Sequence, residues 1–170
     1  MRMIIQSRLI VFFGLRCGQQ LQEHQKCCRQ SGRNYRMSIK GIYDIHCHIV
    51  PGVDDGATDI GETVKLLRME YEQGVRTVIA TPHFRFRMFE TPAEKVREQF
   101  RLVEKAASEI SPDLHVYLGC EFHANMEMLP MLREQKVMTM AGSRYVLTEF
   151  SHNSEESYIR ERLGALLSGG

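Results

Sequence analysis

The sequence lacks paired cysteines, a long apolar run and any marked net charge. Its five cysteines are irregularly spaced and form no CxxC pair. Neither a disulfide framework nor a zinc site built from cysteine pairs is therefore expected, and a reducing cytoplasm is favoured. The apolar stretch at residues 3–15 is interrupted by Arg8 and is too short to span a bilayer. We therefore expect no membrane insertion.

The net charge of +1 conceals two differently charged parts. Residues 1–36 carry seven Lys or Arg and one acid, whereas residues 37–170 carry 15 basic and 20 acidic residues. An acidic body offers no general footprint for nucleic acid. Residues 1–36 also show no sustained periodicity, and Met37 stands just before the first convincing strand pattern. We predict a basic, disordered extension at 1–36 and one domain at 37–170, with Met37 as the native start.

Strand and helix patterns alternate along the predicted domain. Strands are predicted at 41–48, 75–80, 114–119 and 145–148. Helices are predicted at 60–73, 91–110, near 126–135 and after Asn153, with capping boxes at 91–94 and 153–156. This order predicts an α/β fold with parallel strands. A closed (β/α) barrel needs about 250 residues, so we expect an incomplete barrel in a chain truncated at its C-terminus.

The first predicted strand ends in two histidines that share one face. His46 and His48 are two residues apart, so both imidazoles can approach one metal ion while Cys47 points to the opposite side. The pair alone is equally compatible with two histidines that are satisfied by hydrogen bonds within the protein.

Three further strands deliver polar residues to the same rim. The second, third and fourth predicted strands end at His83, Glu121 and Glu149, and Asp54 and Asp55 lie in the first loop. In parallel α/β folds, functional groups collect at the carboxyl ends of the strands. The combination therefore predicts a metal site, although each residue alone could be a turn or capping residue.

The predicted ligands are imidazoles and carboxylates without thiolate, a set that suits Mn²⁺, Fe²⁺, Zn²⁺ or Mg²⁺. Their number exceeds the needs of one ion, so two or three ions are expected. Such centres supply a hydroxide nucleophile and hold the oxygens of a phosphoryl group, while carboxyl or amide hydrolysis stays open. Arg85 and Arg87 follow His83 and are candidates for binding an anionic substrate. A solvated loop is the alternative for both arginines.

Four motifs resemble those of a known enzyme family. Residues 43–57, YDIHCHIVPGVDDGA, are similar to the opening of the bacterial tyrosine-protein phosphatases of the polymerase-and-histidinol-phosphatase (PHP) superfamily. These manganese-dependent enzymes accompany capsular and exopolysaccharide synthesis. IATPH at 79–83, GCE at 119–121 and LTEF at 147–150 resemble the next motifs in order. The resemblance extends from Met37 to the end of the chain.

The resemblance implies a distorted (β/α) barrel of the PHP type with a trinuclear centre. The implied substrate is phosphotyrosine on the tail of a bacterial tyrosine kinase. Carried over by motif, the implied metal ligands are His46, His48, Asp55, His83, Glu121 and Glu149.

The chain also departs from the family pattern. Phe84 stands where many relatives have a second histidine, and the later motifs, a histidine with a nearby arginine and an Asp-x-His pair, cannot be placed within residues 150–170. We therefore expect impaired activity. Two alternatives stay open, namely a phosphoesterase for a small monoester similar to histidinol phosphate, and an inactive remnant.

Overall fold

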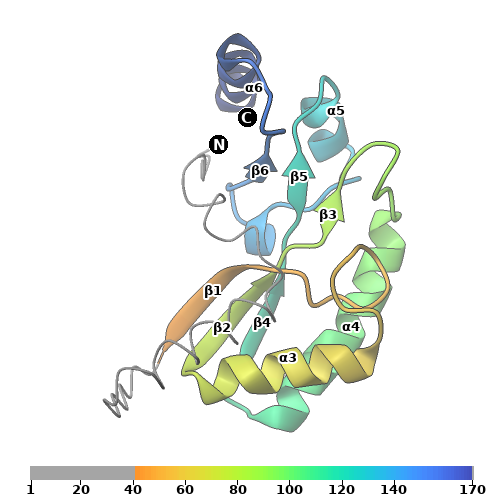
Figure 1. Cartoon of the computed structure of the whole chain (residues 1–170), viewed down its shortest axis with the longest axis vertical. Helices are drawn as coiled ribbons and strands as arrows, with labels where there is room; N and C mark the ends of the chain where they lie inside the picture. Colours follow the sequence, from red (N-terminus) through yellow and green to blue (C-terminus); the bar gives the residue numbers. More distant parts are fainter. Residues whose placement is uncertain (1–40, 170) are drawn as a thin grey trace.

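The computed structural model describes residues 41–169, so the predicted extension at 1–36 and its boundary at Met37 lie outside the described part. Strands and helices alternate along the chain, as predicted (Figure 1). The elements in chain order are β1 (Ile42–Cys47), α3 (Ile60–Glu72), β2 (Val75–Ala80), β3 (His83–Phe84), α4 (Ala93–Ile110), β4 (His115–Leu118), β5 (Glu121–His123), α5 (Met128–Arg133), the 3₁₀ turn η1 (Met140–Gly142), β6 (Leu147–Glu149) and α6 (Glu156–Ser168).

The six strands form two three-stranded sheets. One sheet has the order β1-β2-β4 and the other β3-β5-β6, and all neighbouring strands are parallel. β3 continues the path of β2 after Thr81 and Pro82, and β5 continues that of β4 after Gly119 and Cys120 (Figure 1). The parallel α/β class is thus confirmed. Four of the six strands were predicted; β3 and β5, which are only two and three residues long, were not.

Two amphipathic helices support the first sheet. α3 packs against β2, α4 packs against β4, and the helices contact each other. Leu67, Val78 and Val103 are fully buried between them. Burial of such side chains contributes about 1.5–3 kcal/mol each, so this core holds the carboxyl ends of β1, β2 and β4 in fixed positions. Within residues 41–169, no helix is long and apolar enough to cross a membrane.

The helix starts differ from the two predicted capping boxes. α4 begins after Pro92 and α6 after Glu155, and neither has a side-chain capping hydrogen bond. The Thr91 hydroxyl instead donates to the carbonyl of Val53 at 2.8 Å, which ties the start of α4 to the loop after β1. The unpredicted cap is Asp59, whose carboxylate accepts a backbone N–H in the first turn of α3 at 2.9 Å.

Candidate metal centre

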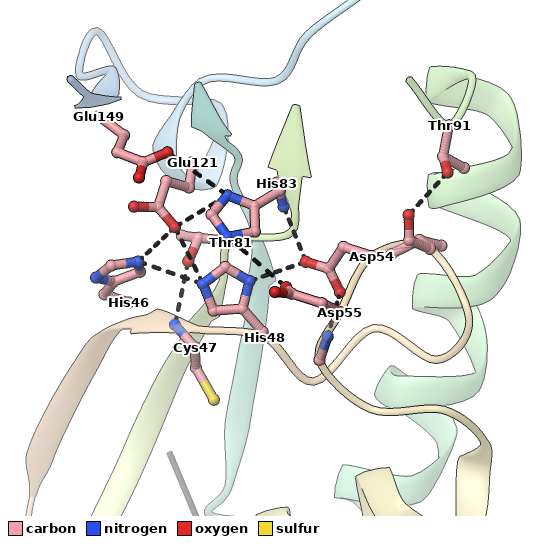
Figure 2. A network of polar contacts seen from close by, with 12 residues as sticks. His46, Cys47, His48, Asp54, Asp55, Thr81, His83, Thr91, Glu121 and Glu149 are labelled. Carbon is pink, nitrogen blue, oxygen red and sulfur yellow. Dashed lines mark hydrogen bonds and ion pairs between the residues drawn. The ribbon is translucent and has the colours of Figure 1, made fainter. Parts of the chain in front are cut away.

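The predicted ligands meet where the two sheets join (Figure 2). His46 lies in β1, and His48 follows that strand directly. His83 opens β3, Glu121 opens β5, and Glu149 closes β6. β3, β5 and β6 are neighbouring parallel strands, so their three predicted ligands lie side by side in one sheet. The polar residues that follow apolar runs in the sequence therefore converge on one place.

Glu121 occupies the middle of the cluster. Its Oε2 lies 2.9 Å from His46 Nε2, 3.1 Å from His48 Nε2 and 3.3 Å from His83 Nδ1. The Glu121 side chain is only 4% exposed. One buried carboxylate oxygen is thus within reach of three imidazoles from two different sheets.

Two buried atoms at this centre lack hydrogen bonds within the described structure. They are His83 Nδ1 and Glu149 Oε2, which lie 4.0 Å apart. Buried polar atoms nearly always have a hydrogen-bond partner, and an exception calls for an explanation such as an ion. A nitrogen and a carboxylate oxygen that face each other at this distance fit ligands of a shared cation.

The six predicted ligands fall into three overlapping groups, each with its donor atoms within 4.8 Å of one another. The groups are His46–His48–Glu121, His48–Asp55–His83 and His83–Glu121–Glu149. Asp55 is the most open member, with a side chain 59% exposed and its Oδ1 3.7 Å from His83 Nε2. The donor types and the three groups fit a centre of two or three divalent ions.

The charged groups of the cluster strongly shift one another's pKa values. Burial lowers the pKa of His48, but hydrogen bonds and charges from Asp54 and Glu121 outweigh burial and raise this pKa to about 10. Burial raises the pKa of Glu121, but its hydrogen bonds with His46 and His48 hold that pKa well below the usual range. Because a ligand imidazole must be neutral, a metal ion that binds here has to displace the proton of His48.

The two predicted substrate-binding arginines lie on a turn that follows β3. The backbone N–H of Arg85 donates to the Phe89 carbonyl at 2.8 Å, and the Phe89 ring stacks on His83 with 5.2 Å between centroids. Arg87 is exposed near the tip of the turn and has a φ of 61°. The turn is thus anchored beside the cluster through the His83–Phe89 stack.

A family profile described as "Capsular polysaccharide synthesis, CpsB/CapC" matches residues 42–170. The chain belongs to this family. The match covers every strand and helix of the described structure, and it includes all six clustered side chains.

Curated relatives in the CpsB/CapC family are named as tyrosine-protein phosphatases. CpsB of Streptococcus pneumoniae is 41% identical over 129 residues, which are 76% of this chain and 53% of that protein. YwqE of Bacillus subtilis (strain 168) is 32% identical over 120 residues, which are 71% of this chain and 47% of that protein. The chain therefore spans about half the length of the curated relatives that it matches.

A solved structure of a relative confirms the fold of this chain. It comes from a crystallographic study of YwqE and CpsB, which describes both as metal-dependent tyrosine phosphatases. The TM-score is 0.67 at 31% sequence identity, and the match covers 74% of this chain and 51% of the other. The two open sheets are thus the incomplete α/β barrel that the sequence predicted.

Both cysteines near the cluster point into the core. Cys47 is 1% exposed, and its thiol lies 3.5 Å from Glu70 on α3, on the side of β1 opposite His46 and His48. Burial, together with the charge of Glu121, raises the pKa of Cys120. A protonated, buried thiol is a poor nucleophile, so Cys120 is a residue of the hydrophobic core.

His46 and the neighbouring Cys47 lie on opposite faces of β1, so their substitutions should have different effects on metal binding. His46→Ala is expected to lower bound Mn²⁺, because it removes a donor that lies 2.9 Å from Glu121. Cys47→Ala should keep full metal content and lose only about 1 kcal/mol of stability. Metal content after dialysis and urea unfolding measure the two effects. Equal metal loss in both variants would contradict the assignment of the metal to the face of His46. It would favour the group Asp44–Cys47–Glu70 as the metal site instead.

Proposed function

We propose that this chain forms the N-terminal part of a cytoplasmic, metal-dependent protein-tyrosine phosphatase. The observation that carries the proposal is the set of three overlapping ligand groups around Glu121. Three groups that share members suit a multinuclear centre better than a single structural ion, which needs only four ligands. The names of the CpsB and YwqE relatives support the reaction type.

In this proposal, six side chains hold two or three Mn²⁺ ions, with Fe²⁺, Zn²⁺ or Mg²⁺ as alternatives. They are His46, His48, Asp55, His83, Glu121 and Glu149. Divalent ions in such centres activate a water molecule and offset negative charge on a phosphoryl group. The chain's own contribution is to keep the carboxylate of Glu121 between the imidazoles and to keep His83 in place by stacking it on Phe89.

The turn after β3 is the proposed substrate contact. Arg85 and Arg87 would donate to phosphate oxygens, because guanidinium groups bind phosphate through paired hydrogen bonds. Phe86 is 45% exposed and Met88 is 58% exposed on the same turn, which gives an apolar surface for the ring of a phosphotyrosine. The proposed partner is the phosphotyrosine-bearing tail of a bacterial tyrosine kinase.

A substrate comparison tests the proposal. The Mn²⁺-loaded chain is assayed with a phosphotyrosine peptide and with histidinol phosphate, and kcat/KM is expected to favour the peptide by at least about tenfold. His83→Ala should abolish the activity, whereas Asp113→Ala, far from the cluster, should leave it unchanged. A preference for histidinol phosphate, activity that survives His83→Ala, or a chain that binds no divalent ion would each overturn the proposal.

A further inference from the structure

Asp54 is enclosed although it lies in the loop beside an exposed residue. Its side chain is 0% exposed, whereas that of Asp55 is 59% exposed. Its Oδ2 accepts hydrogen bonds from His48 Nδ1 at 2.8 Å and from the backbone N–H of His83 at 2.9 Å. Its Oδ1 accepts from the backbone N–H of Gly56 at 3.0 Å. Figure 2 shows Asp54 on the side of His48 away from Glu121.

The loop can bring Asp54 to this position only because residue 56 is glycine. A Cβ on Gly56 would lie 2.2 Å from the carbonyl oxygen and 2.5 Å from the Cβ of His48. The chain therefore turns back tightly onto β1, and Ala57 donates to the same His48 carbonyl at 3.0 Å. The Asp54–His48 pair is thus part of a closely packed turn.

The hydrogen bond at Nδ1 decides which nitrogen of His48 is available to the centre. A carboxylate only accepts hydrogen bonds, so Nδ1 must carry the proton. The other ring nitrogen, Nε2, then presents its lone pair when the imidazole is neutral. This Nε2 lies 3.1 Å from Glu121 Oε2 and 3.4 Å from His46 Nε2, in the middle of the proposed ligand set.

We propose that Asp54 is a positioning residue, which fixes the tautomer and ring orientation of His48 and aligns it with β3 through the backbone of His83. This inference rests on the proposed metal centre. Asp54 itself stays outside the ligand set, because both its oxygens are used by three donors and its side chain is fully buried. One carboxylate thereby sets the relative positions of two ligands from different sheets.

The test is the isosteric substitution Asp54→Asn in the full chain. The amide has one acceptor oxygen and one NH₂ group, so it cannot satisfy His48 Nδ1–H and Gly56 N–H together. When its NH₂ faces His48, the proton must move to Nε2, which then cannot bind a metal ion. Loss of a hydrogen-bond partner of a ligand histidine lowers metal affinity about 10- to 100-fold, and calorimetric titration with Mn²⁺ is expected to show this loss.

Two further measurements separate positioning from a general structural role. Asp59→Asn is the matched control, because Asn caps helices as well as Asp, and its Mn²⁺ affinity should stay within about twofold of the unaltered chain. In a His48→Gln background, Asp54→Asn should cause almost no additional loss, because its effect acts through that ring.

Nitrogen-15 NMR of the Zn²⁺-loaded chain, which is diamagnetic, provides a readout without any substitution. The unaltered chain should show His48 bound through Nε2 with a slowly exchanging proton on Nδ1, and Asp54→Asn should lose that proton signal. Metal bound through Nδ1, unchanged affinity in Asp54→Asn, or reduced affinity with an unchanged His48 spectrum would each overturn the role of Asp54. A chain that binds neither Mn²⁺ nor Zn²⁺ would overturn the proposed metal centre itself, and this inference with it.

Discussion

Glu121→Gln is expected to cause the largest loss of bound metal of any single substitution in the cluster. Glu121 belongs to two of the three ligand groups, and one of its oxygens lies within 3.3 Å of three imidazoles. The amide removes the negative charge that holds several cations together. Substituting a mere hydrogen-bond partner of a metal ligand costs about 10- to 100-fold in affinity, so a shared ligand should cost at least about 100-fold.

Glu70→Gln is the matched control for this experiment. Glu70 is also buried, at 5% exposure, but it lies on α3 and contacts the opposite face of β1 through Cys47. Mn²⁺ titration and metal analysis should show near-normal binding for Glu70→Gln and little binding for Glu121→Gln. Circular dichroism of both metal-free variants checks folding. If both variants lose metal equally, the loss reflects the fold, and Glu121 is not a shared ligand.

Residue spacing was enough to predict the cluster because parallel strands bring their carboxyl ends together. Period-two alternation placed His46 and His48 on one face of β1 and Cys47 on the other, and the structure has this arrangement. Apolar runs that end in His83 and Glu149 likewise marked the rim. These inferences depend only on backbone geometry, which short sequence patterns encode well.

The missed features depend on contacts between distant segments. β3 and β5 are too short to have a periodicity, and they exist because His83 and Glu121 are in register across two strands. Thr91 has the pattern of a helix cap, yet its hydroxyl bonds to the loop after β1. The different roles of neighbouring Asp54 and Asp55 follow from the direction of the turn, which their adjacent positions in the sequence do not reveal.

The second large effect is expected on phosphatase activity, when further strands are added that can pair with the open edges of the two sheets. Among the described residues, β1 pairs only with β2, and β6 pairs only with β5, so both strands have an unpaired edge in that range. Unpaired strand edges favour association with other chains. Within residues 41–169, the ion pairs of Glu121 and Glu149 are all with histidines, so the only arginines proposed to bind phosphate in this range are Arg85 and Arg87 on the turn after β3.

A chimaera in which residues 41–169 replace the matching half of S. pneumoniae CpsB should hydrolyse a phosphotyrosine peptide at least about 100-fold faster than the 170-residue chain. Removing one well-placed donor to a developing negative charge costs about 10²–10³-fold in kcat, and completing the ligand set should add to this difference. Both proteins are loaded with Mn²⁺, and kcat is compared at saturating peptide.

The chimaera carrying Glu121→Gln is the control. Its kcat should fall back to the level of the 170-residue chain, because the activity of the completed centre must depend on the ligands that this chain provides. Comparable kcat values for the chain and the unaltered chimaera would contradict the expectation, and would show that the six clustered side chains and the turn with Arg85 and Arg87 suffice for catalysis.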